Sequence, residues 1–223
     1  MKKITVSTKI ICGLLLAFIF GLQDSLSAQN SSAAGEDLVW LVVQGDIKSG
    51  RAGEESWWGW SRSPKDIVCK KFKVDIALSD IKAFKLHYKM GHDPYDPVLK
   101  QHTAKELGNI SIYINDKPAV NKPAAELAGK GWHSLSLKPA FLKSGENTVK
   151  FTWTVSAKGR YGIFYMAIDN SRRTGRSSAS GDKGLSFHTE SLQAGGKPRD
   201  KTQGELLIAV ELGLEKKNKT EIK

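Results

Sequence analysis

The chain has 223 residues, in which 34 lysines and arginines outnumber 23 aspartates and glutamates, so the formal net charge is +11. This excess favours acidic partners such as anionic polysaccharide, cell-surface polymer or nucleic acid, without choosing among them. Lysine on solvent-facing strand positions, which protects sheet edges from aggregation, explains the same charge equally well. With only two cysteines, a disulfide-rich scaffold is excluded, and a hydrophobic core must supply the stability.

Residues 1–28 have the order of a secretory signal peptide. Three lysines precede the apolar run "IICGLLLAFIFGL", and small residues follow it up to Ala28, where we expect cleavage. The apolar run is too short for a membrane-spanning helix, which needs about 20 residues. We therefore expect a secreted or periplasmic protein without stable membrane insertion. Cys69 alone would remain after cleavage, and its place in "DIVCKKFKV" predicts a buried strand residue.

The rest of the chain divides into a flexible segment at 29–37, a single β-sandwich domain at 38–215 and a disordered charged tail at 216–223. Short runs rich in β-branched and aromatic residues alternate with turn residues, and no segment has a sustained helical pattern. This predicts an all-β, antiparallel jelly-roll β-sandwich of about nine strands. The expected strands are 38–45, 67–74, 83–90, 110–116, 133–139, 148–155, 162–169, 184–190 and 205–212.

Two motifs carry a family resemblance. "NISIYINDKPAV" reads as a strand that ends in an Asn-Asp turn, and "LKSGENTVKF" as a turn that leads into the next strand. Together they resemble the galactose-binding-domain-like jelly roll, the fold of many carbohydrate-binding modules. The matching positions are Tyr113, Ile114, Asn115, Asp116, Leu142, Gly145, Glu146, Asn147 and Val149. The resemblance implies a fold much more than a ligand, because that family includes sugar binders, lipid and protein binders, and structural modules.

The stretch "EESWWGWSRS" places Trp57, Trp58 and Trp60 within four residues. In a loop at the rim of a sandwich, an indole can stack on the apolar face of a sugar ring, while Arg62 bonds its hydroxyls. The alternative is that these rings close the end of the core, since exposing three large aromatic side chains invites aggregation. We expect at least one indole, Trp58 or Trp60, to contact a ligand.

A second candidate group is the stretch "KGRYGIFYMAIDNSRRTGRSS". Guanidinium groups bind carboxylates and sulfates through paired donors, so an arginine-rich loop suits an acidic sugar. The alternative is that these arginines are solvated or paired with a nearby carboxylate, Asp169 or Asp182. The candidate ligand-binding residues here are Arg160, Tyr161, Asp169, Arg172, Arg173 and Arg176.

The loop "LHYKMGHDPYDPVLKQH" adds a third group, whose imidazoles and carboxylates could hold a metal or share a proton. Its members are His87, His92, Asp93, Asp96 and His102. Its spacing matches no ligand signature, so we assign neither a metal ligand nor a catalytic residue. Tyr95, between two prolines, is a candidate second stacking surface. Galactose-binding-like domains often carry a structural calcium ion, but the sequence shows no calcium-loop spacing, so we assign no cofactor.

These observations favour a secreted, non-catalytic carbohydrate-binding β-sandwich whose partner is a polysaccharide or cell-surface glycan. The arginine-rich loop suits an acidic polysaccharide. One alternative is a structural or protein-interaction module of an extracellular assembly, with all tryptophans buried. Another is a polysaccharide-acting enzyme that uses His87, His92 or His133. Nucleic acid ranks below polysaccharide, because the basic residues are spread along many strands and an exported protein meets polysaccharide more often.

Overall fold

Antiparallel strands make up most of the chain described by the computed structural model. It describes residues 38–46, 55–61, 66–96, 101–102, 108–127, 129–154, 163–172, 174–190, 192 and 204–216, with the backbone alone at 55–61, 95–96, 102 and 163. All of them belong to one compact unit, Gly35–Lys223. The expected segments 1–28 and 29–37, and residues 217–223 of the expected tail at 216–223, lie outside the described residues.

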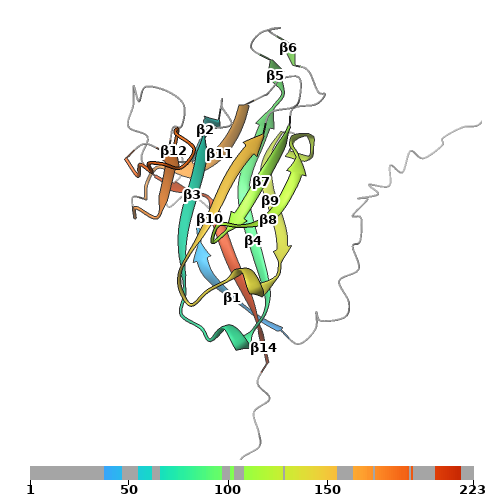
Figure 1. Cartoon of the computed structure of the whole chain (residues 1–223), viewed down its shortest axis with the longest axis vertical. Helices are drawn as coiled ribbons and strands as arrows, with labels where there is room; N and C mark the ends of the chain where they lie inside the picture. Colours follow the sequence, from blue (N-terminus) through green and yellow to red (C-terminus); the bar gives the residue numbers. More distant parts are fainter. Residues whose placement is uncertain are drawn as a thin grey trace, which may run out of the picture. The chain divides into compact units, whose positions relative to one another are not determined.

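The described strands bear out the prediction of an all-β antiparallel fold (Figure 1). The helical elements in this part of the chain are three short 3₁₀ turns. These turns are η1 (Leu78–Asp80), η2 (Ala124–Leu127) and η3 (Pro139–Phe141). The strands are β1 (Leu38–Gly45), β2 (Glu55–Ser61), β3 (Ile67–Val74), β4 (Ile81–Asp93), β5 (Tyr95–Asp96), β6 (Gln101–His102), β7 (Asn109–Ile114), β8 (Lys117–Pro123), β9 (Gly129–Leu137), β10 (Gly145–Thr154), β11 (Ile163–Asp169), β12 (Ser177–Ser180), β13 (Glu205–Leu206) and β14 (Ile208–Glu215).

Two sheets form the sandwich. The seven-stranded sheet runs β1-β14-β4-β11-β13, with β2 paired to β11 and β9 paired to β4. The five-stranded sheet runs β12-β3-β10-β7-β8, and β5 and β6 form a separate two-stranded ribbon. Strand β4 is the centre of the larger sheet, because β9 pairs with it along one edge while β14 and then β11 pair along the other.

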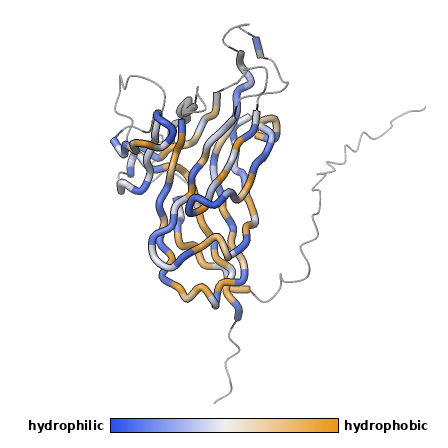
Figure 2. The backbone as a smooth tube through the Cα atoms, viewed as in Figure 1, coloured by the Kyte–Doolittle hydropathy of each residue, from blue (hydrophilic) through white to orange (hydrophobic). Residues whose placement is uncertain are grey.

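The core lies between the two sheets and follows directly from the alternation of residues along the strands. In β4, Phe84, Leu86, Tyr88 and Met90 are buried, and side chains from β10 face them from the other sheet. The rings of Tyr88 and Phe151 lie 5.2 Å apart between centroids. Figure 2 shows the same alternation of hydrophobic and hydrophilic residues along the strands.

The predicted turn after "ISIYI" forms as the motif required. Asn115 and Asp116 have φ angles of 51° and 64°, in the left-handed region that Asn and Asp tolerate. The Asn115 amide donates to the Asn147 side-chain oxygen at 2.7 Å, and Asn147 in turn donates to the carbonyl of Lys143 at 2.8 Å. The two asparagines of the family-like motifs therefore tie adjacent turns of the five-stranded sheet together.

The predicted strand positions need three corrections. Residues 184–190 form turns and bends, and only an isolated bridge between Ala179 and His188 connects them to a neighbour. The tryptophan-rich stretch is strand β2, and residues 117–123 form β8, where the sequence predicted loop and turn. With β5, β6 and β12, the described strands exceed the nine expected. Cys69 is a buried residue of β3, as predicted.

Candidate functional site

A cavity opens where β4 ends and β9 and β11 begin. Its volume is about 310 Å³, and its lining combines an aromatic ring, a cation, a carboxylate and an imidazole. Such a mixture of ring surface and a few polar groups is typical of a small-molecule site. The lining residues are His92, Asp93, Pro94, Gly129, Lys130 and Tyr165.

The register of three strands brings the lining together. Gly91 of β4 is paired with Lys130 of β9 on one side and with Tyr165 of β11 on the other. A Cβ atom at Gly91 would lie 2.1 Å from the carbonyl oxygen of Gly129, so only glycine permits β9 to approach this closely. Across the space above Gly91, the Lys130 ammonium lies 4.3 Å from the centre of the Tyr165 ring.

His92 is the most deeply buried polar group of the lining, with 4% of its surface exposed. Its ring packs 4.7 Å from that of Phe164, and within the described part of the chain its Nε2 atom has no hydrogen-bond partner. Burial lowers the pKa of His92 to about 4, against the opposing charge of Asp93. At neutral pH the ring is therefore uncharged, with Nε2 available to a ligand group.

The backbone of β2 lies beside this cavity, because Gly59 is paired with Tyr165. Trp58 is paired with Met166 and Trp57 with Ala167, so the tryptophan-rich stretch is a strand and not the predicted loop. Tyr95 begins β5 immediately after the cavity residues Asp93 and Pro94. The side chains of the β2 tryptophans and Tyr95 lie outside the described residues, as do Arg62, Arg160, Tyr161 and Arg173 entirely.

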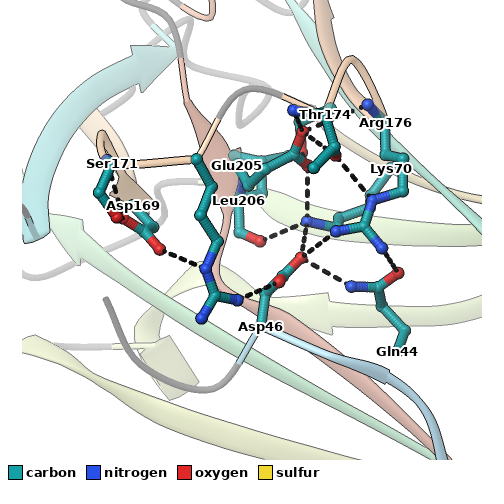
Figure 3. Close-up of polar contacts among 11 residues, drawn as sticks. Gln44, Asp46, Lys70, Asp169, Ser171, Thr174, Arg176, Glu205 and Leu206 are labelled. Carbon is teal, nitrogen blue, oxygen red and sulfur yellow. Dashed lines mark hydrogen bonds and ion pairs between the residues drawn. The ribbon is translucent and has the colours of Figure 1, made fainter. Parts of the chain in front are cut away.

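Asp169, Arg172 and Arg176 belong to a different cluster at the other end of β11 (Figure 3). The Nε atom of Arg172 lies 3.0 Å from Asp169, and its Nη1 atom 2.6 Å from Asp46. Arg176 donates to Gln44 at 2.7 Å and lies 3.3 Å from Asp46. Arg172 is thus paired with Asp169, as the alternative to ligand binding predicted from the sequence.

Lys70 lies at the centre of this cluster and connects the two sheets. It is fully buried on β3, with its ammonium 2.5 Å from Asp46, 2.9 Å from Glu205 and 2.9 Å from the carbonyl oxygen of Leu206. Burial alone would raise the pKa of Glu205, but the charge of Lys70 and hydrogen bonds from Thr174, Lys70 and Ser177 lower it to about 2. This arrangement is a buried ion network that joins the sheets.

No role for Lys70 was predicted from the sequence, although the alternation of residues in "IVCKKFKV" indicates that its side chain faces the core. Val68, Lys70, Phe72 and Val74 occupy every second position of β3, and all four are buried. A lysine at a core-facing position requires a buried carboxylate. The reading also missed Lys130 and Tyr165, together with the partly exposed Trp40 and Trp132. These residues become neighbours only through the pairing of strands, which cannot be predicted from a single sequence.

The histidines do not gather into one catalytic group. His87 lies between Ser134, at 2.6 Å, and Glu211, at 3.2 Å, whereas His92 lines the cavity. His133 is stacked on Tyr88 and hydrogen-bonded to a backbone carbonyl, and burial lowers its pKa. Among the described residues, no three His, Cys, Asp or Glu side chains lie together as metal ligands.

The described residues also contain no helix long and apolar enough to cross a membrane.

Comparison with known proteins does not assign a family. No protein-family model and no curated protein sequence matches the chain. Among solved structures, the chain is similar to a family 35 carbohydrate-binding module from an environmental isolate, at 10% sequence identity and a TM-score of 0.25. The match covers 61% of this chain and 88% of that module. Because the TM-score is this low, the function has to be argued from the residues of this chain.

Proposed function

We propose that the protein is an exported, non-catalytic carbohydrate-binding β-sandwich whose binding site is the cavity between β4, β9 and β11. The observation that carries this proposal is the cavity itself, in which Tyr165, Lys130 and an unpartnered His92 nitrogen converge beside the tryptophan-rich strand β2. Export is supported by the signal-peptide pattern of residues 1–28.

Each group of the lining suits one feature of a sugar. The Tyr165 ring offers a surface for the C–H face of a sugar ring. His92, uncharged at neutral pH, can bond a hydroxyl through Nε2, and Asp93 can accept a hydroxyl hydrogen. Lys130 supplies a cation for a carboxylate or sulfate group. We assign contact with an acidic sugar to Lys130, because it lines the cavity and its ammonium lies 4.3 Å from the centre of the Tyr165 ring.

The carboxylates near the cavity favour binding over hydrolysis. Most glycoside hydrolases place two carboxylates on either side of the bond that they cleave. Within the described lining, Asp93 is the single carboxylate. Trp57, Trp58, Trp60, Arg62, Tyr95, Arg160, Tyr161 and Arg173 remain proposed ligand contacts.

The test is a titration of residues 29–223 with neutral and acidic polysaccharides, in which tryptophan fluorescence reports binding. Tyr165→Ala, His92→Phe and Trp58→Ala should weaken binding while the protein still melts cooperatively. Tyr113→Ala, which removes a half-buried tyrosine from the five-stranded sheet, is the matched control and should bind normally. Equal binding by the Tyr165→Ala and Tyr113→Ala variants would contradict the assignment of the site.

A second candidate function, a protein-interaction module, rests on strand β1. This edge strand exposes the apolar side chains of Val39, Leu41 and Val42. Exposed apolar edges are templates for pairing with another strand. The same titration separates the two functions. Absence of a response to every glycan, together with a large fall in the melting temperature of Trp58→Ala, favours the interaction module.

A further inference from the structure

The seven-stranded sheet has an outer face that carries lysine and tryptophan. The core-facing residues of β4 alternate with outward residues, and Lys85, His87 and Lys89 are therefore on the side away from the other sheet. Strand pairing places side chains of β9 and β1 on the same side. The lysine–tryptophan face consists of Trp40, Lys85, Lys89, Lys130 and Trp132.

Trp40 marks one end of this face. Its indole lies over Gly213 of β14, where a Cβ atom would come within 3.3 Å of the ring. The Lys85 ammonium lies 3.8 Å from the ring centre, so a cation–π contact holds the indole against the sheet. Trp40 nevertheless remains 37% exposed, which leaves part of the residue open to a ligand.

Trp132 marks the other end, next to the cavity. It is 41% exposed and is paired with Lys89 across the strands β9 and β4. Two residues earlier on β9, Lys130 reaches over Tyr165. The lysine–tryptophan face is therefore continuous with the proposed sugar site at this end.

The surface between the two indoles is polar and carries more positive than negative charge. His87 connects Ser134 to Glu211 across three strands, and Glu211 is the carboxylate of this row. Lys85 and Lys89 flank the row on β4. From the strand geometry, with about 3.3 Å per residue and about 4.8 Å between strands, the Cα atoms of Trp40 and Trp132 are about 24 Å apart. That distance exceeds the length of a single sugar.

We propose that the lysine–tryptophan face binds an extended, linear polyanionic glycan that lies across the sheet from the cavity to Trp40. This inference rests on the proposed function and adds to it the class of ligand and its path. Exposed indoles supply stacking surfaces at both ends, and lysines along the path complement acidic groups on the polymer. A ligand of this kind should bind in proportion to its length, because short fragments reach only one indole.

The experiment uses two polymers with the same backbone, carboxymethylcellulose and hydroxyethylcellulose, in affinity gel electrophoresis of residues 29–223. Carboxymethylcellulose should retard the protein, and hydroxyethylcellulose should retard it much less. Trp40→Ala and Trp132→Ala should each reduce the retardation several-fold. Phe187→Ala is the aromatic control, since Phe187 has a similar exposure of 36% and lies near Lys150 of the five-stranded sheet.

A pair of lysine variants separates a defined surface from general charge attraction. Lys85→Gln removes a charge from the lysine–tryptophan face, and Lys73→Gln removes one from an exposed position on β3. The proposal expects Lys85→Gln to weaken the retardation clearly more than Lys73→Gln. Equal effects would mean that the basic protein attracts polyanions without a dedicated surface, which overturns the inference.

A length series completes the test. Fragments produced by partial hydrolysis of carboxymethylcellulose should compete for the protein more strongly as they lengthen, and Trp40→Ala should abolish the advantage of long fragments. If Trp132→Ala weakens binding and Trp40→Ala does not, the extended path is wrong while the cavity remains a sugar site. If no glycan of any kind binds, the proposed function itself fails. Stronger binding to hydroxyethylcellulose, to single-stranded DNA or to a protein would overturn the polyanionic glycan as occupant.

Discussion

Replacing Lys70 by methionine should strongly destabilise the fold while preserving the length of the side chain. The ammonium contacts Asp46 and Glu205, both buried, and Asp46 keeps the guanidinium groups of Arg172 and Arg176. Glu205 would keep the hydroxyl donors of Thr174 and Ser177 but lose the charge of Lys70. The loss of stability should therefore arise mainly at Glu205.

Removing one partner of a buried ion pair costs about 3–5 kcal/mol. The lowering of the Glu205 pKa from its ordinary 4.5 to about 2 corresponds to about 3 kcal/mol of stability. Lys70 shares this lowering with Thr174 and Ser177, so the ion pair sets the size of the expected loss and the pKa sets its pH range. Since this pKa is lowered by folding, the stabilisation is present above pH 4.5 and is lost as the pH falls towards 2. The deficit of the variant should accordingly be full at neutral pH and shrink in acid.

Urea unfolding followed by tryptophan fluorescence at pH 7 and at about pH 3 measures both quantities. Lys71→Met is the matched control, because Lys71 is the next residue of β3 and its contact with Glu146 is solvent-exposed. That control should lose less than about 1 kcal/mol. Adding Glu205→Gln to Lys70→Met should recover part of the loss. A Lys70→Met protein within about 1 kcal/mol of the native one, or a deficit independent of pH, would refute the reasoning.

Three further outcomes can be measured. Asn147→Ala should lower the free energy of unfolding by about 1–3 kcal/mol, because the buried Asn147 side chain pairs with both the backbone N–H and the carbonyl of Lys143; a loss near zero in urea unfolding would contradict this. Gly91→Ala should lower the melting temperature in calorimetry, because the new Cβ atom would clash with the carbonyl oxygen of Gly129. Gly131→Ala, whose Cβ atom would have nothing within 4 Å, should lower it less. Equal melting temperatures would show that β9 shifts to accommodate the alanine without loss of stability. Cys69, whose pKa burial raises to about 11, should react with a thiol reagent only after unfolding in urea, and reaction in the folded protein would show that the site opens.

Much of the fold was predictable because alternation in the sequence reports burial directly. Strands β1 and β3 have the bounds that their apolar runs predicted. Strand β8 was missed because "KPAVNKP" contains two prolines, which an edge strand tolerates since β8 pairs with β7 alone. The apolar residues of 184–190 suggested a strand, but Asp182 accepts hydrogen bonds from Ser186 that hold the segment in a turn.

The candidate site was less predictable, because its residues meet through long-range pairing. Lys130 and Tyr165 are 35 positions apart in the sequence and become neighbours only because both strands flank Gly91. The arginine-rich loop was correctly recognised as charged, yet its partner Asp46 follows β1, far away in the sequence. Composition therefore indicated the kinds of side chain, while the sheet register determined which of them meet.

The pairing of β1 with β14 has a consequence for how the protein folds. The first strand of the sandwich finds its neighbour only when the last strand has been synthesised, so the chain closes through contacts of the largest sequence separation. Loop closure of this kind slows folding, and unpaired apolar strands favour aggregation in the meantime. Until β14 is synthesised, the apolar run "LVWLVV" lacks its partner strand, which makes this segment the one most prone to aggregation during folding.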